Sequence, residues 1–166
     1  MNRALVIKSL WFQSLWFVAV IGREQTLVLL TAAILFTLAY SVRKQEIRMG
    51  WLAGFVISGI ALDYFNSVLG FFLFPTAFVP NWLIALWVIF IWYAYQMKPV
   101  LTLYPIWAVT VVGALGAAGS YFAGLKLGAV EWPLSNSLTF AVVTVEWIIL
   151  FSVIVTSLGG EKRALS

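Results

Sequence analysis

The sequence contains neither cysteine nor histidine among its 166 residues. Without cysteine there are no disulfides, no thiol chemistry and no iron–sulfur ligands. Without histidine the chain lacks the commonest general base, the usual haem ligand and a common zinc ligand. Both absences weigh against redox and metal catalysis, so we expect no metal site and no cofactor.

Charge is also scarce. Charged residues make up 10% of the chain, against about 25% in an ordinary soluble domain. Hydrophobic residues make up 63%, and they form runs long enough to cross a bilayer, which takes about 20 residues each. We therefore expect residues 1–166 to form a single integral membrane domain. The first apolar run lacks a small-residue cleavage site, so we interpret it as a retained helix and not as a signal peptide.

The apolar runs predict an all-α fold, a polytopic membrane helical bundle with six transmembrane helices. Their expected ranges are about 4–22, 25–41, 49–72, 81–96, 101–125 and 134–158.

The basic residues predict the orientation of this bundle. They sit at the ends of the apolar runs, so the net charge of +4 is not a nucleic-acid signal. Positive residues accumulate in cytoplasmic loops. With the N-terminus inside, the outer side keeps only Arg23 and Lys126. The sequence thus predicts cytoplasmic N- and C-termini, because eight of the ten basic residues then lie inside: Arg3, Lys8, Arg43, Lys44, Arg48, Lys98, Lys162 and Arg163.

Residues 58–75 are apolar enough to lie in a bilayer, yet they include Asp63. An ionisable residue inside a membrane helix is costly and normally faces the protein interior or a wet cavity. Asn66 and Ser67 follow at positions i+3 and i+4, so the three side chains share one helix face. We expect this face to point into the bundle and the other helices to pack around it.

A second acid, Glu146, lies inside the last apolar run. At 1.5 Å per residue, Asp63 lies roughly 12 Å and Glu146 roughly 15–18 Å below the outer surface. If the acids face each other, repulsion and burial would keep at least one protonated. They could form one polar site with Gln13, Asn66, Ser67, Ser120 and Tyr121. The alternative is that each acid is hydrogen-bonded separately to a neighbouring helix, and Gln13 has the same structural alternative.

Small residues recur every four positions in the fifth apolar run, at Gly116, Ser120 and Gly124. Small residues at this spacing let helix backbones approach closely. We interpret them as helix-packing residues and expect this helix to be central. A phosphate-binding glycine loop is excluded, because no strand precedes these glycines. For Trp87, deep in the fourth run, we favour packing over a cofactor platform.

Two segments echo each other. Tyr64-Phe65 leads to Leu69-Gly70 and Phe74-Pro75, and Tyr121-Phe122 leads to Leu127-Gly128 and Trp132-Pro133. In both, the aromatic-Pro pair begins four residues after the glycine, where a helix is expected to leave the membrane. This echo is consistent with a repeated two-helix hairpin, although chance is a serious rival in so biased a composition.

Four segments together resemble a known family. They are Trp11-Phe12-Gln13-(x)2-Trp16-Phe17, Leu62-Asp63-(x)6-Gly70-(x)3-Phe74-Pro75, Pro80-(x)1-Trp82-Leu83-(x)2-Leu86-Trp87 and Gly119-Ser120-Tyr121-(x)2-Gly124-(x)2-Leu127-Gly128-Ala129-Val130. Their order resembles that of the DUF2878 family of small bacterial inner-membrane proteins of unknown function. The resemblance covers nearly the whole chain. It implies a bacterial inner (cytoplasmic) membrane location and an association with fatty-acid-modifying methyltransferases, and it supplies no catalytic residue.

Three function classes stay open at this point. The first is an accessory or enzyme of membrane-lipid or fatty-acid modification that binds an apolar ligand between helices. The second is a small transporter or proton-coupled carrier that uses Asp63 and Glu146. The third is a structural or assembly subunit of a membrane complex. The partners expected are membrane lipids, with a membrane-protein partner or a homo-oligomer left open and no nucleic acid. Whether the protein is an enzyme is also open.

Overall fold

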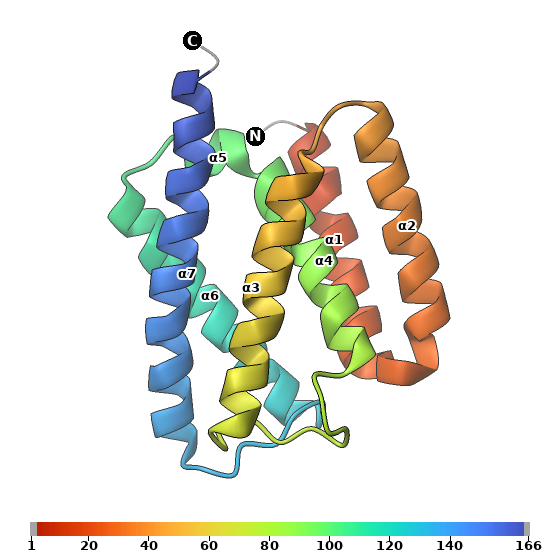
Figure 1. Cartoon of the computed structure of the whole chain (residues 1–166), viewed down its shortest axis with the longest axis vertical. Coiled ribbons are helices and arrows are strands. Elements are labelled where there is room, and N and C mark those ends of the chain that lie inside the picture. The colour runs from red at the N-terminus through yellow and green to blue at the C-terminus, as the bar shows by residue number, and fades with distance from the viewer. Residues whose placement is uncertain (1–2, 165–166) are drawn as a thin grey trace. The chain divides into compact units, whose positions relative to one another are not determined.

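The computed structural model describes residues 3–164, and all the helices and turns below refer to that range. Figure 1 shows the path of the chain. The regular elements in this range are helical, as the sequence predicts. They are α1 (Arg3–Gly22), the short 3₁₀ helix η1 (Arg23–Thr26), α2 (Leu27–Arg43), α3 (Met49–Val68), α4 (Asn81–Gln96), α5 (Lys98–Leu101), α6 (Ile106–Lys126) and α7 (Asn136–Ala164).

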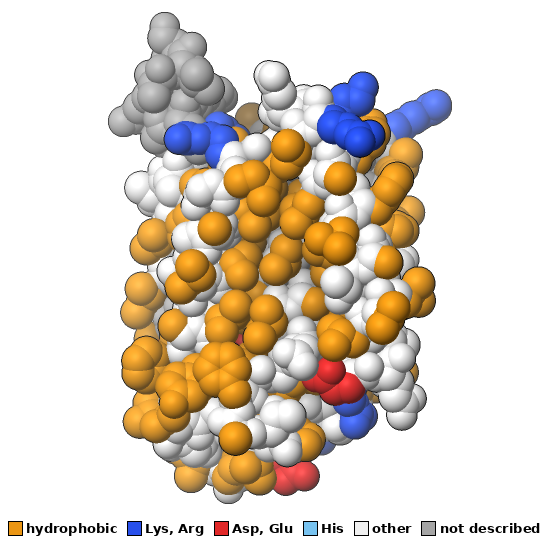
Figure 2. Space-filling view, turned by 45° about the vertical axis from the view of Figure 1, so that its right-hand side comes forward, with side chains coloured by type: hydrophobic (Ala, Val, Ile, Leu, Met, Phe, Trp, Pro, Cys, Tyr) orange, Lys and Arg blue, Asp and Glu red, His pale blue; other side chains and the backbone are white. Residues whose placement is uncertain are grey.

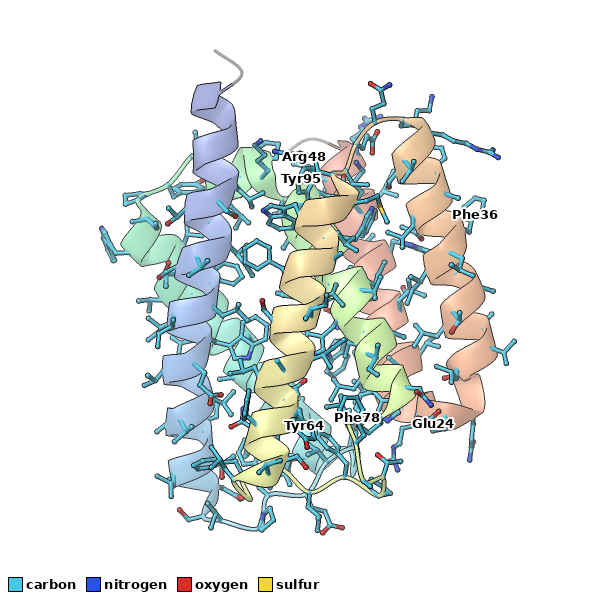
Figure 3. All side chains as sticks on the ribbon, in the orientation of Figure 1. Glu24, Phe36, Arg48, Tyr64, Phe78 and Tyr95 are labelled. Carbon is cyan, nitrogen blue, oxygen red and sulfur yellow. The ribbon has the colours of Figure 1, made fainter. Side chains whose placement is uncertain are left out.

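The chain divides after Gln96 into two compact units. In the first unit α4 is the central helix, because it contacts α1, α2, α3 and η1. Eight of its sixteen residues are buried. Figure 3 shows Arg48 and Tyr95 at one end of this unit and Glu24, Tyr64 and Phe78 at the other. The aromatic composition of α4 thus follows from its place in the core of the unit.

The turn between α1 and α2 also fixes the start of α4. The Thr26 hydroxyl donates to the Val18 carbonyl at 2.8 Å, which closes the turn back onto α1. The backbone N–H of Asn81 donates to Glu24 Oε1 at 3.0 Å. The first N–H groups of a helix have no partner within the helix, and a carboxylate there also interacts favourably with the helix dipole. Glu24 therefore anchors the first turn of α4.

The third helix is shorter than predicted. We expected it to reach residue 72, but α3 ends at Val68. Gly70 has a φ of +79°, and its N–H donates to the Ser67 carbonyl at 3.2 Å while Phe71 N–H donates to Asn66 at 2.9 Å. A left-handed glycine with such bonds is a common helix ending. Hydrophobicity continues past this point because Phe72 is buried in the loop, and so the sequence suggested a longer helix.

The second unit contains α5, α6 and α7, and α7 contacts both other helices. The predicted start of the fifth membrane helix, residue 101, is wrong. The chain first forms α5, and α6 begins only after Pro105, whose ψ of 136° is extended. Proline also disfavours the helical conformation in the residue before it. The last helix was expected over 134–158, and α7 extends to Ala164.

The two similar segments noted in the sequence, around Gly70 and Gly128, have the same backbone geometry at their helix ends. Gly128 has a φ of +68°, close to that of Gly70. Its N–H donates to the Leu125 carbonyl at 3.1 Å, and Ala129 N–H donates to Gly124 at 2.8 Å. These bonds span the same residue offsets as those around Gly70. The shared turn is a second observation in favour of a repeated hairpin.

The close helix contact in α6 lies at a different glycine from the one predicted. Within the second unit, a Cβ on Gly113 would overlap the ring of Phe151 on α7, whereas a Cβ on Gly116 would meet nothing within 4 Å. Ser120 is half-buried, and a Cβ on Gly124 would be in ordinary contact with Val130. The tight helix contact in this unit therefore lies at Gly113 and not at Gly116, because Gly113 is the glycine that faces α7.

By length and composition, four helical segments within residues 3–164 could cross a membrane. They are Arg3–Arg43, which contains α1, η1 and α2, and Met49–Val68, Ile106–Lys126 and Asn136–Gly159. Asn81–Gln96 is a shorter apolar helix. The apolar, all-helical architecture is compatible with a membrane protein. The count of six spans and the cytoplasmic position of both termini stay predictions.

Candidate functional site

The candidate site begins with the buried face of α3. Its buried residues recur every three or four positions, so they form one stripe along the helix. Asp63 lies in this stripe and is only 1% exposed. Its burial requires a hydrogen-bonding partner, since a buried polar group without one is costly. The members of the stripe are Leu52, Val56, Gly59, Asp63 and Asn66.

The partner of Asp63 comes from α4. The indole Nε1 of Trp87 donates to Asp63 Oδ2 at 2.6 Å, and both residues are buried. This distance is short for a nitrogen donor. The indole N–H can only donate a hydrogen bond, and the carboxyl oxygen can accept it, so the two groups are complementary. The bond joins the two helices at a point where water is excluded.

Gly59 makes this bond sterically feasible. It lies one turn before Asp63, on the same face of α3. A Cβ at Gly59 would overlap the six-membered part of the Trp87 ring system. The missing side chain therefore leaves the space in which the indole lies against the α3 backbone. Gly59 and Asp63 together form a seat for Trp87, the first supplying space and the second an acceptor.

The other candidate residues of the first unit have different environments. Asn66 is 2% exposed and continues the buried face of α3, while Ser67 is half-buried. Gln13 is exposed on α1. Its neighbour Phe12 instead stacks on Tyr93 of α4 at 4.6 Å between ring centroids. Gln13 thus does not join Asp63 on the buried face of α3.

Three residues of the predicted polar site belong to the second unit, and one of them, Ser120, is half-buried on α6. Tyr121 is half-buried on α6, and its ring centroid lies 6.2 Å from that of Trp147 on α7. Glu146, also on α7, is half-buried. A polar site that combines Tyr121 and Glu146 with Asp63 stays a prediction.

The polar bonds around α4 extend well beyond Asp63, and the sequence reasoning did not find them. Trp92 Nε1 donates to Ser41 Oγ on α2 at 2.8 Å. The Ser9 hydroxyl on α1 lies 3.0 Å from the Tyr93 hydroxyl. Each helix that packs on α4 is therefore joined to it by a side-chain hydrogen bond. The sequence could have indicated these bonds, because indole donors and hydroxyls inside apolar helices each need a partner where water is absent.

A further polar cluster lies where α1, α4 and the loop after α2 meet. The Lys8 ammonium forms a salt bridge with Glu46 at 2.8 Å and donates to Gln96 Oε1 at 2.6 Å. Gln96 Nε2 donates in turn to the backbone carbonyl of Glu46 at 3.2 Å. Lys8, one of the basic residues predicted on the inner side, is therefore paired with Glu46 and Gln96. The cluster ties the loop to α1 and α4.

A family comparison completes this picture. The model of the family described as "Protein of unknown function (DUF2878)" matches residues 5–153. The chain belongs to the DUF2878 family. The matched range includes Gly59, Asp63 and Trp87. No curated protein and no solved structure matches the chain.

The chemistry that this DUF2878 protein can carry is limited by its side chains. Among the described residues no group of three or more acidic side chains could hold a metal ion. The Asp63 carboxyl can hold or release a proton, and it can orient the indole of Trp87. Its neighbours on the stripe supply no second acid. The geometry of the first unit thus assigns Asp63 a role in joining α3 to α4.

Proposed function

We propose that this DUF2878 protein is a multi-pass protein of the bacterial inner membrane that takes part in membrane-lipid or fatty-acid modification. It crosses the membrane six times, with both termini in the cytoplasm. The distribution of positive charge supports this orientation, because eight of the ten basic residues then lie on the cytoplasmic side. The α1–α2 segment supports two crossings, since it turns back at η1.

The ligand proposed is a hydrocarbon chain. The observation that carries this choice is the contrast between the inside and the outside of the first unit. Polar side chains of its helices bond one another across the contacts with α4. The outward face of α2 is instead apolar, with Val28 85% and Phe36 71% exposed (Figure 3). An exposed apolar surface of this kind favours contact with acyl chains over contact with a polar solute.

In this proposal the Trp92–Ser41 bond holds α2 against α4, so that the opposite, apolar face of α2 stays exposed. The Trp87–Asp63 bond holds α3 in the same unit. The protein acts with, or as, an enzyme that modifies the acyl chain.

The fatty-acid composition of the membrane tests this function. Cells that lack the gene should show a changed profile of modified fatty acids, and the wild-type gene should restore it. Asp63→Asn, which keeps the size and the acceptor oxygen of the side chain, should restore it if Asp63 acts through its hydrogen bond alone. An unchanged profile in the deletion strain would reject a role in lipid modification.

A proton-coupled carrier is the second candidate, favoured by one observation. Asp63 is an ionisable residue buried at membrane depth, and such residues mark proton relays in many membrane proteins. In this case Asp63→Asn should abolish proton uptake into vesicles that contain the purified protein, and Glu146→Gln should do the same. If vesicles with wild-type protein take up protons no faster than empty vesicles, the carrier is excluded. An assembly role remains if neither assay responds.

A further inference from the structure

The segment that leads into α6 has an inner and an outer side. It consists of α5 and residues 102–107, and it lies in the second unit. On the inner side α5 contacts α7, and Val100 and Leu101 are half-buried. On the outer side the five consecutive residues from Leu103 to Trp107 are all exposed. The exposed fraction is 73% for Leu103 and 71% for Trp107, so this side of the segment is open.

Part of this exposed run has irregular backbone. Pro105 precedes α6, and its ψ of 136° is extended. Residues 102–105 thus form a linker directly before the first turn of α6. Irregular backbone in contact with lipid does not occur inside the hydrocarbon region, because its N–H and C=O groups would lack partners there. In a membrane the exposed linker therefore lies at the interface, where headgroups and water can bond to its backbone.

The side chains of the run are of the kinds found at a membrane interface. Leu103 is apolar, while Tyr104 and Trp107 each combine an apolar ring with a polar group. Such rings are enriched where the hydrocarbon region meets the headgroups. Lys98 is the last charged residue before Lys126, so the run also lies where the charged part of the sequence gives way to an uncharged helix. Composition and position both match the surface of a lipid leaflet.

We infer that Leu103–Trp107 is an interfacial anchor, which binds the boundary between headgroups and acyl chains in the leaflet at the start of α6. The Tyr104 hydroxyl and the Trp107 indole N–H bond to headgroups or water, and Leu103 contacts the outer part of the acyl chains. The anchor fixes the depth at which α6 enters the membrane.

The inference rests on the membrane location proposed above and not on the activity. The surface of the molecule supports that location. Figure 2 shows one face, on which hydrophobic side chains form a broad band and Lys and Arg side chains gather beyond one end of it.

The depth of a spin label tests the anchor. The sequence has no cysteine, so one introduced cysteine carries the only nitroxide label. The full-length protein is reconstituted in vesicles of phosphatidylethanolamine and phosphatidylglycerol in equal amounts. Collision rates of the label with oxygen and with a water-soluble nickel chelate are then measured. Oxygen concentrates among the acyl chains and the chelate stays in water, so the ratio of the two rates rises with depth.

Two reference positions frame the expected result. Val112→Cys places the label on an exposed residue further along α6, and Lys44→Cys places it in the exposed loop between α2 and α3. The ratio should be lowest at Lys44→Cys, intermediate at Leu103→Cys and Trp107→Cys, and highest at Val112→Cys. Far-UV circular dichroism and a detergent melting curve check that each variant is folded. Tyr104→Cys carries the same expectation and replaces either anchor variant that is unstable.

A second measurement distinguishes an anchor from a segment that only lies at the interface. Leu103→Ser/Trp107→Ser should lower the collision ratio of a label at Val112, because α6 then shifts toward water. Leu29→Ser/Phe36→Ser is the matched control, since it removes side chains that are 63% and 71% exposed on α2. It should leave the ratio at Val112 unchanged.

Three results would overturn the anchor alone. The first is a ratio at Leu103→Cys and Trp107→Cys as low as at Lys44→Cys, which would place the run in water. The second is slow collision with both reagents, which would show that protein, such as a second copy of the chain, covers the run. The third is the same ratio at Val112 in both serine variants, which would show that the run does not fix the depth of α6.

A different result would reject the membrane location and the anchor together. It is a ratio at Val112→Cys, without the serine substitutions, as low as at Lys44→Cys. Because the readout is depth, a failed fatty-acid assay leaves the anchor intact, and a failed depth measurement at the run leaves the fatty-acid assay unaffected.

Discussion

At the scale of single residues, Trp87 determines how Asp63 is accommodated. Replacing Trp87 by Phe removes the donor at Asp63 Oδ2 and keeps an aromatic ring in the space beside Gly59. A buried acceptor left without its donor costs about 1–3 kcal/mol, whereas hydrogen bonds between membrane helices average about 0.6 kcal/mol. We expect Trp87→Phe to lower the melting temperature in detergent, as followed by circular dichroism.

The matched control for this prediction is Trp107→Phe, because Trp107 is 71% exposed. It should leave the melting temperature nearly unchanged. In an Asp63→Leu background, Trp87→Phe should cost less than in wild type, since the acceptor is already absent. Additive effects of the two substitutions would contradict a direct bond between the residues.

Gly59 provides a second prediction at this scale. Gly59→Ala should destabilise the protein, because its Cβ would overlap the Trp87 ring in a tightly packed core. Gly54 lies on the same helix, and a Cβ there would meet nothing within 4 Å. Gly54→Ala should be neutral or stabilising, because alanine has a helix propensity about 1 kcal/mol better than glycine. Thermal unfolding in detergent compares the two, and equal melting temperatures would refute the packing role of Gly59.

At the scale of helices, the contact between α6 and α7 depends on one glycine that the small-residue pattern did not single out. The pattern suggested Gly116, but in the second unit it is Gly113 that lies against Phe151. Gly113→Ala should lower thermal stability, and Gly116→Ala should leave it unchanged or raise it. A larger loss for Gly116→Ala would show that the close packing predicted from the spacing is the correct one.

Several helix ends are determined by residues at the end itself. The stops at Gly70 and Gly128 are set by glycines in left-handed conformations, and the start of α6 is set by Pro105. These are short-range effects of the residue types. The apolar residues after Gly70 concealed the first stop, because Phe72 and Phe74 are buried in a loop and not in a helix.

At the scale of the whole molecule, the topology is the main prediction. Reporter domains fused after Ser166 and inserted in the 43–48 loop should both give cytoplasmic signals, and a reporter in the loop between α3 and α4 should give a periplasmic one. The reason is the distribution of positive charge. A periplasmic signal at either of the first two positions would contradict the proposed orientation and the count of six spans.

The sequence by itself determined that the chain is helical and apolar and that it resembles the DUF2878 family, because periodicity, composition and motifs are properties of the chain alone. It also indicated that Asp63 needs a partner in the protein, because the cost of a buried polar group does not depend on the fold. It could not identify that partner. Trp82, Trp87 and Trp92 all carry an indole donor on α4, and only the packing of α4 against α3 brings Trp87 to Asp63. The same holds for Gly54 and Gly59. Both are glycines of α3, and the sequence does not show that only Gly59 lies against the ring of Trp87 on α4. Such contacts join residues that are far apart in the chain, and only the tertiary structure decides them.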